Sequence, residues 1–161
     1  MKKLGIFLAV ACLLTLLAGT ASAKVIDSAG NKFDLAQDVL ATSPVEGDYV
    51  AVGLNVTLES GVTGDIFAFG RNVTITDEGS VQNIIAAGQV VNIRAAQVRN
   101  IYAGGGDITV AAGTEAGGVY IAGANVTFSG TAQDVVLAGT SVTVDGTGYG
   151  TDGTLWGGEI L

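Results

Sequence analysis

The chain has 161 residues, of which 25 are glycine, one is proline and 48% are hydrophobic, a composition typical of short strands joined by turns. Seven basic against fifteen acidic residues give a net charge of −8, which excludes nucleic acid as a partner because phosphates require clustered lysine and arginine. Histidine is absent and the one cysteine, Cys12, falls in an apolar leader, so the sequence excludes a disulfide framework, imidazole or thiolate metal sites and histidine-activated nucleophiles.

Residues 1–23 have the features of a signal peptide. Two lysines precede an apolar run over residues 4–17, and small residues then lead to an A-x-A cleavage site that ends at Ala23. Removal of Lys2 and Lys3 with this segment would leave 5 basic and 15 acidic residues, a net charge of −10. Because the same stretch is about long enough to cross a bilayer, an uncleaved membrane anchor stays open as the alternative. The sequence therefore predicts an exported protein, whether periplasmic, on the cell surface or secreted.

Residues 24–44 come after the leader and lack the pattern of the rest of the chain. Phe33, Leu35, Val39 and Leu40 lie close to helical spacing, which predicts a short helix or a bent strand. We expect this segment to cap a stack of strands formed by the later residues, because an uncovered sheet edge pairs readily with other chains.

A ten-residue phrase occurs six times within residues 45–145. The copies start at Tyr49, Ile66, Ile84, Ile101, Val119 and Val135, so the steps are 16–18 residues. A unit this short cannot bury a core alone and is typical of one coil of a solenoid. Alternation at period two predicts three short strands per coil, with glycine at corners where φ must be positive. The sequence predicts one all-β domain, a three-sided parallel β-helix of about six coils and about 29 Å long.

The second strand of each coil shows the clearest alternation. Its inward position predicts a core column of Val56, Val73, Val91, Ile108, Val126 and Val142. The residues beside this column must point outward, and most of them carry amides or hydroxyls. The predicted Asn/Thr face consists of Asn55, Thr57, Asn72, Thr74, Thr109, Asn125, Thr127 and Thr143.

The first strand is apolar on both of its sides. One alternate set begins with Tyr49; the other, which we call the apolar ladder, consists of Val50, Phe67, Ile85, Tyr102, Tyr120 and Val136. Only one set can face the core, and the spacing does not decide which. Either choice leaves large apolar groups outside, and such patches are usually covered. The cover could be residues 24–45, which is the alternative we favour, or it could be a second molecule or residues beyond this chain. In either of the last two cases the apolar ladder is the predicted association surface.

Residues 146–161 are glycine-rich and contain Trp156, which predicts a weakened further coil or a C-terminal tail. No polar cap is evident there. A solenoid without polar terminal repeats stacks end to end or is continued by more chain.

The phrase V-x-G-D-I-x-A followed by V-x-I occurs at Val62, Gly64, Asp65, Ile66, Ala68, Val73 and Ile75. It resembles the bactofilins, which are bacterial polymer-forming cytoskeletal proteins, and the likeness covers roughly residues 45–144. The resemblance implies a right-handed three-sided β-helix that assembles end to end without a nucleotide and has no catalytic residues. The signal peptide, the apolar outer side of the first strand and the low charge depart from type members, so the chain looks more like an exported relative.

Three other patterns have both a functional and a structural explanation. Asn55, Asn72 and Asn125 each begin a glycosylation sequon, but they share one point of the repeat. The threonine column could order ice, although threonine is also a good outward strand residue. Calcium could bind a corner column that is otherwise explained by turn formation. This column consists of Asp48, Asp65, Asn83, Asn100, Gly118 and Asp134.

The coils vary by only a residue or two, which leaves no long loops from which to build a catalytic cleft, and Arg71, Arg94 and Arg99 are scattered. The sequence therefore predicts a protein that is not an enzyme and needs no cofactor. We expect an exported, structural, self-associating β-solenoid of the cell envelope that polymerises by end-to-end stacking of coils, with itself and cell-envelope components as partners. The alternative left open is a monomeric surface adhesive that binds carbohydrate or ice.

Overall fold

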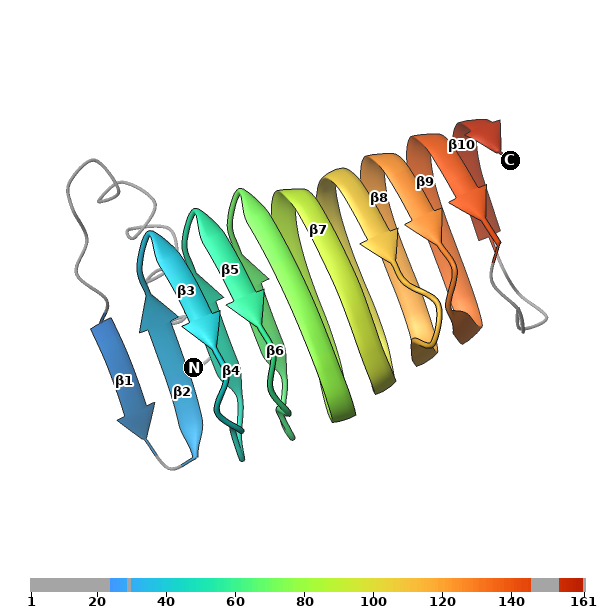
Figure 1. Ribbon diagram of the computed structural model, residues 1–161. Helices are drawn as coiled ribbons and strands as arrows, with labels where there is room; N and C mark the ends of the chain where they lie inside the picture. The colour runs from blue at the N-terminus through green and yellow to red at the C-terminus, as the bar shows by residue number, and fades with distance from the viewer. Residues whose placement is uncertain (1–23, 29, 146–153, 161) are drawn as a thin grey trace, which may run out of the picture.

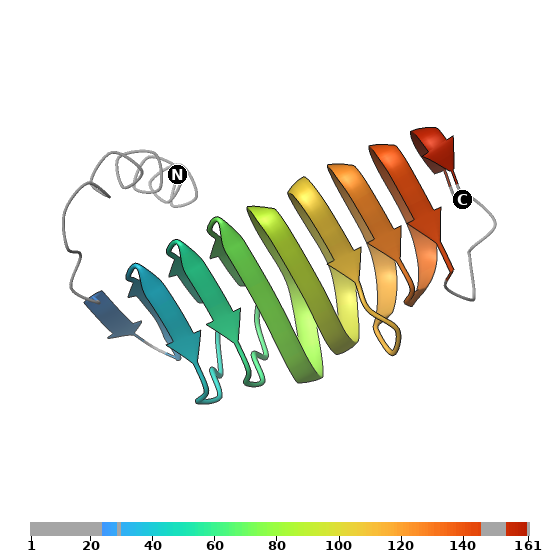
Figure 2. The ribbon, with the colours of Figure 1, turned by 45° about the horizontal axis from the view of Figure 1, so that its top comes forward.

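The computed structural model describes residues 24–28, 30–145 and 154–160. They form a parallel β-solenoid of about seven turns, which confirms the predicted all-β fold and adds a turn to the predicted number. Figure 1 shows a rod that begins at β1 (Lys24–Ser28) and finishes at β10 (Thr154–Ile160). The turned view in Figure 2 shows the coils arranged one after another along a single axis.

The strands of the first coils are short and separate. They are β2 (Asn31–Leu35), β3 (Asp38–Ala41), β4 (Tyr49–Val52), β5 (Asn55–Leu58) and β6 (Ile66–Phe69). In later coils the pairing continues around the corners, which gives the long strands β7 (Asn72–Val110), β8 (Glu115–Phe128) and β9 (Thr131–Val144). We call the sides of the rod first, second and third, after residues 66–69, 72–75 and 80–82 of one coil.

Neighbouring coils pair in parallel, with equivalent positions of the repeat opposite one another. On the first side Tyr49 pairs with Ile66, which in turn pairs with Ile84. On the second side Val56 pairs with Val73. Because each step keeps this register, residues of one kind stack in columns about 4.8 Å apart.

The register of the first strand places the Tyr49 set inside. Tyr49 and its equivalents as far as Val135 are at most 2% exposed, and the column that begins at Ala51 is buried as well. The apolar ladder therefore lies on the outer surface. The tyrosine hydroxyls are consistent with this register, because a buried tyrosine needs a hydrogen-bond partner for its hydroxyl. Tyr49 donates to Asp34, whereas Tyr102 and Tyr120 are exposed.

The second side contributes most of the large core residues. The six residues of the column from Val56 to Val142 are at most 1% exposed. The next inward column contains Leu58, Ile75, Ile93, Val110 and Phe128, all buried. Burial of one such side chain contributes about 1.5–3 kcal/mol, so every stacked coil adds several contributions of this size. The third side contributes smaller residues, namely Val62, Val81, Val98, Ala116 and Ala132.

Glycine at the corner between the first and second sides does not have the role predicted for it. Among the described glycines, positive φ angles occur at Gly30 and Gly113 and not at these corners. A Cβ at Gly70 would lie 2.8 Å from the carbonyl oxygen of Gly53, and one at Gly88 would lie 2.7 Å from that of Gly70. The prediction of positive φ was wrong. Glycine is needed because the backbone of the adjacent coil occupies the space where a side chain would begin.

The N-terminal segment forms a complete coil. β2 and β3 pair in parallel with β4 and β5, and no helix occurs between residues 30 and 45. Only β1 reverses direction and pairs with β2 in antiparallel fashion at the edge of the stack (Figure 1). The stack thus begins before residue 44, where the boundary of a capping segment was predicted. This first coil was not recognised in the sequence because Lys32 and Asp34 occupy two of its inward positions, so the segment lacks the apolar alternation of the later coils.

The other end of the rod carries a parallel strand. β10 pairs with β9 from Thr154 opposite Val136 to Ile160 opposite Val142, and so starts a further coil. The remainder of the predicted C-terminal segment, residues 146–153 and 161, lies outside the described residues, as does the predicted signal peptide.

Candidate functional site

The apolar ladder forms a ridge along the outer face of the first side. Tyr102 and Tyr120 are 43% and 37% exposed, and the other four members are partly exposed. Phe33 pairs with Val50 and therefore extends the ridge by one coil toward the N-terminus. The ridge spans every coil from β2 to β9.

The two tyrosines of the ridge stack on each other. Their ring centroids are 5.2 Å apart and the rings are inclined by only 11°. Each ring thus directs a flat face at its neighbour, whereas a platform that stacks on sugars must present a ring face to solvent. The geometry of this pair argues against stacking of a sugar on Tyr102 or Tyr120.

A shallow apolar furrow runs beside the ridge. It has a volume of about 450 Å³, and small residues on the neighbouring outward column leave it open. These small residues are Ala87, Gly104, Ala122 and Ala138. Ridge and furrow together make a strip that another apolar ridge could fill.

The favoured expectation was that residues 24–45 cover the apolar ladder, but the described backbone of residues 24–28 and 30–45 lies within the stack and not over its outer face. β1 lies within the sheet, with Lys24 opposite Leu35 and Ser28 opposite Asn31, and residues 30–45 form the first coil. The structure therefore corrects this expectation for a physical reason: the segment is used to extend the stack lengthwise. The alternatives that remain are a second molecule and residues beyond this chain.

The structure places all eight residues of the Asn/Thr face on the outside of the second side, but its amides bond to one another. Asn55 Nδ2 donates to Asp38 Oδ1 at 2.5 Å, and Asn72 Nδ2 donates to Asn55 Oδ1 at 2.7 Å. Asn125 Nδ2 donates to Asp107 Oδ1 at 2.6 Å. Coil-to-coil bonds thus occupy the same nitrogen that glycosylation would modify in each sequon. The threonines of this face form a second outward column next to the amides, and they are partly buried.

The Asp/Asn corner column likewise links successive coils. Asp48 Oδ1 accepts the backbone N–H of Asp65 at 2.9 Å, and Asp65 Oδ1 accepts Asn83 Nδ2 at 2.7 Å. In the next coil Asn100 Nδ2 donates to Asn83 Oδ1 at 2.9 Å. In the part of the chain that the structure describes, no three acidic, histidine or cysteine residues gather in a way that could hold a metal ion. Turn formation and hydrogen bonding account for this column.

A polar cluster that was not predicted from the sequence lies inside the first coils. Tyr49 Oη donates to Asp34 Oδ2 at 2.7 Å, and Lys32 Nζ lies 3.2 Å from the same oxygen. Lys32 Nζ is also 5.5 Å from the centroid of the Tyr49 ring. Burial raises the pKa of the Tyr49 phenol, and the hydrogen bond to Asp34 and the charge of Asp34 raise it further. The alternation Lys32-Phe33-Asp34 was the available signal, since two charged residues there share the inward face.

A second buried carboxylate sits at the corner between the second and third sides. Asp77 is 1% exposed and accepts the backbone N–H of Val62 at 2.9 Å and that of Gly79 at 2.7 Å. It therefore ties its own turn to the preceding coil. The available signal was the alternation, since Asp77 follows Val73 and Ile75 at period two, but the turn composition of Thr76-Asp77-Glu78-Gly79 led to its interpretation as an ordinary corner residue.

Comparison of the chain with protein-family models, with curated proteins and with solved structures finds no match. Over residues 24–28, 30–145 and 154–160 there is no helix long and apolar enough to cross a bilayer. Any assignment of function to this chain therefore rests on its fold and its surfaces.

Proposed function

We propose that the chain is an exported structural protein of the cell envelope that associates with itself through the outer face of its first side. The observation that carries the proposal is the apolar ladder, which with Phe33 extends from β2 to β9 without cover from the described residues. Export rests on the signal-peptide features of residues 1–23.

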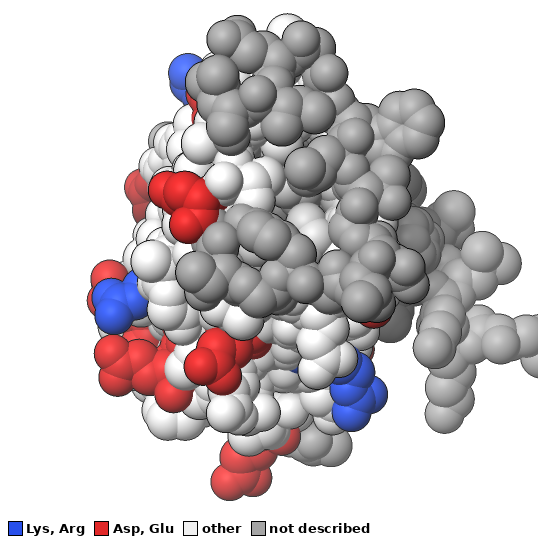
Figure 3. Space-filling model, turned by 90° about the vertical axis from the view of Figure 1, so that its right-hand side faces the viewer, with Lys and Arg blue, Asp and Glu red and all other residues white. Residues whose placement is uncertain are grey.

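A second copy of the chain is the occupant that fits the ladder best. The strip is flat, free of charged side chains and alternates ridge with furrow, so the ridge of one molecule matches the furrow of another. Sheets pack face to face at about 10 Å through interdigitated apolar side chains, which this arrangement would reproduce. Elsewhere the surface is acidic: Figure 3, seen from the C-terminal end, shows acidic side chains at several places and few basic ones.

The strip is narrow for a tight dimer. Six coils give a length of about 29 Å and the strip is two side-chain columns wide, whereas stable pairs bury roughly 800 Å² per partner. We therefore expect two copies to associate weakly, and an assembly of many copies side by side to be more stable than a single pair.

End-to-end stacking, which the sequence predicted as the route of assembly, has less support. The charged residues Lys32 and Asp34 occupy the inward positions of β2 in the first coil, and β1 pairs along one edge of that coil. Both features oppose the seating of another apolar coil at this end. The likeness to bactofilins remains a proposal with which the solenoid shape is compatible.

Sedimentation velocity of the exported chain over a range of concentrations tests the proposal. The variant pair Tyr102→Lys with Tyr120→Lys places two like charges on neighbouring coils of the ladder. The matched control is Thr109→Lys with Thr127→Lys, because these residues pair in the same two coils on the second side. We expect oligomers of the unmodified chain, monomers of the ladder variant and oligomers of the control.

Salt and imaging separate the possible routes of assembly. Copies with the same negative charge repel one another, so added salt should strengthen association through an uncharged strip. Negative-stain images should show particles that widen with concentration. A monomeric unmodified chain, or a ladder variant that associates normally, would overturn the proposal, and particles that lengthen without widening would restore end-to-end stacking. Mass spectrometry of the exported chain should find an N-terminus at Lys24.

A further inference from the structure

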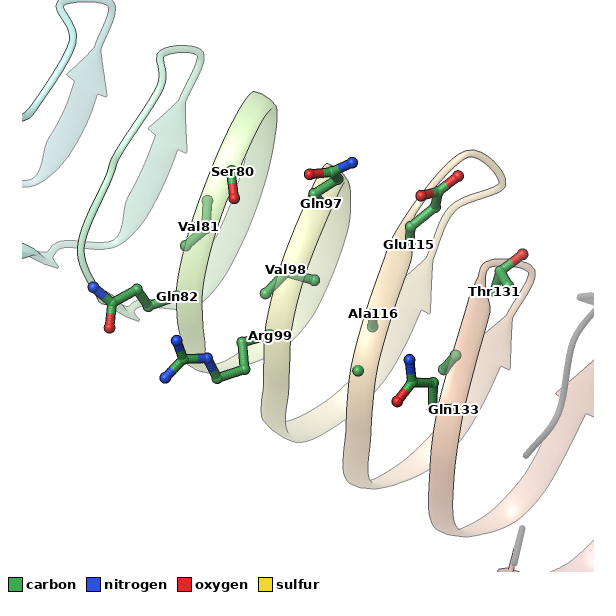
Figure 4. Close-up of a pocket in the computed structure, with 12 residues that line it drawn as sticks. Ser80, Val81, Gln82, Gln97, Val98, Arg99, Glu115, Ala116, Thr131 and Gln133 are labelled. Atoms are coloured by element: carbon green, nitrogen blue, oxygen red, sulfur yellow. The ribbon is translucent and has the colours of Figure 1, made fainter. Parts of the chain in front are cut away.

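The third side of the rod carries a hollow that is unrelated to the apolar ladder. It has a volume of about 480 Å³ and spans four coils, at residues 80–82, 97–99, 115–117 and 131–133. Figure 4 shows two rows of side chains along it, with the inward residues Val81, Val98 and Ala116 between them. Strand geometry sets the rows about 7 Å apart and the outer coils about 14 Å apart. The hollow is therefore a trough parallel to the axis of the rod.

The walls of the trough are polar and exposed. Seven side chains supply three carboxamides, one guanidinium, one carboxylate and two hydroxyls, namely Ser80, Gln82, Gln97, Arg99, Glu115, Thr131 and Gln133. Gly117 has no side chain and interrupts one row next to Arg99. A Cβ at Gly117 would lie 2.6 Å from the carbonyl oxygen of Arg99, so this opening is fixed by the stacking of the backbone.

The hydrogen-bonding groups of the trough are unused, unlike those at the corners of the coils. None of the seven side chains makes a hydrogen bond or ion pair within the described chain, including Arg99 and Glu115 on neighbouring coils. At the corners, by contrast, amides and carboxylates bond from coil to coil, as Asn72 does to Asn55 and Asn83 does to Asp65. The trough thus combines many donors and acceptors with no internal partner for them.

The balance of charge and the spacing of the coils define the ligand that fits. The charges of Arg99 and Glu115 cancel, so the trough has no net charge. The rod as a whole is acidic and repels polyanions, and a neutral ligand is therefore favoured. A ligand along the axis meets side chains at equivalent positions of the repeat about every 4.8 Å, which is close to the advance of one β-1,4-linked pyranose unit. Successive units of such a glycan are rotated by about half a turn, so every second sugar presents the same groups to every second coil. An extended peptide presents a side chain to one face only every 6.6 Å or so and falls out of step. Amide and carboxylate groups bond well to hydroxyl and acetamido groups.

We infer that the third-side trough binds a neutral linear glycan, which lies along the axis with about one sugar for each coil. Gln97, Arg99 and Glu115 lie at its centre and supply most of the hydrogen bonds. This site is distinct from the Asn/Thr face and the apolar ladder, to which the sequence pointed for a possible carbohydrate function, and it does not depend on self-association.

Titration calorimetry with cellohexaose and with N-acetylchitohexaose tests the inference on the exported chain. We expect saturable binding of at least one hexasaccharide. The variant Gln97→Ala with Arg99→Ala should bind at least tenfold more weakly, since both residues are exposed and the fold does not use their side chains. Gln37→Ala is the matched control, because Gln37 is an exposed glutamine on another part of the rod.

Two further measurements make the outcome decisive. The disaccharide of the bound sugar should bind far more weakly than the hexasaccharide, because it reaches only two coils. Circular dichroism should show that all variants keep the β-solenoid. Absence of binding to both hexasaccharides, or equal binding by the trough variant and by the unmodified chain, would overturn the inference.

Discussion

The outer faces of the first and second sides lie over equally buried cores and have opposite chemistry. Ile66 beneath the first face and Val73 beneath the second are both 0% exposed. The first face is an apolar ridge, whereas the second is a row of amides that bond from coil to coil. The coil is thus specified by its inward columns and corner glycines, and its outward columns are free to differ. An apolar outward column is not required by the fold and calls for another explanation.

The largest predicted effect tests whether inward and outward positions differ in burial. Val73→Asp places an unpartnered charge inside the stack and should lower the free energy of unfolding by at least about 3–5 kcal/mol. Thr74→Lys, one residue further on and directed outward, should change it by less than about 0.5 kcal/mol. Urea denaturation followed by circular dichroism measures both. Equal stability of the two variants would contradict the assignment of the columns.

Tyr49→Phe tests the buried polar cluster beneath the first face. Loss of a hydrogen bond to a charged group should cost about 1.5–3 kcal/mol at neutral pH. The pKa of Tyr49 is raised in the folded chain, so above about pH 10 the unfolded chain loses a proton that the folded chain keeps, and the free energy of unfolding falls as pH rises. Denaturation at about pH 8 and above pH 10 should show a smaller fall for Tyr49→Phe. The exposed Tyr102→Phe should behave as the unmodified chain does.

Gly88→Ala tests the corner that joins the two sides. A Cβ there would lie 2.7 Å from the carbonyl oxygen of Gly70, so the coils must separate, at a cost of about 1–3 kcal/mol. Gly61→Ala is the control, because no atom lies within 4 Å of the added Cβ and its φ is not positive. The control should be neutral or more stable by about 0.4–1 kcal/mol. Thermal unfolding should rank the control above the unmodified chain and Gly88→Ala below it.

The smallest predicted effect concerns the amides of the second face. Asn72→Ala removes the bond to Asn55 and should cost about 0.5–1.5 kcal/mol. Asn92 is also exposed on this side but makes no side-chain hydrogen bond within the described chain, so Asn92→Ala should have a smaller effect. If both substitutions cost the same, the bonded row does not stabilise the stack.

The sequence predicted the coil itself, because one side of the second strand is apolar and the other polar. Val73 and Thr74 differ so clearly in hydropathy that only one register is possible. On the first side, Tyr49 and Val50 are both apolar, and hydropathy could not choose between them. The register is set by the stacking of whole coils, which also brings Tyr49 to Asp34, fifteen residues earlier in the chain, and no local pattern shows such contacts.

Features that depend on contacts between coils were not predictable from the pattern. The first coil was missed because Lys32 and Asp34 occupy inward positions that are apolar in every other described coil. The trough was missed because Gln97, Arg99 and Glu115 do not form a column of one residue type. In the sequence Arg99 is a scattered charge, and only the stacking of four coils brings it beside the carboxamides.

The parallel pairing of the coils has a mechanical consequence. Hydrogen bonds between coils point along the axis of the rod, so a force that pulls the two ends apart acts on one coil boundary at a time. Each boundary that opens releases a coil of 16–18 residues, about 55 Å of extended chain. We expect single-molecule stretching to show a series of nearly equal lengthening steps at modest force. Under tension such a rod would act as an extensible link that opens in small increments.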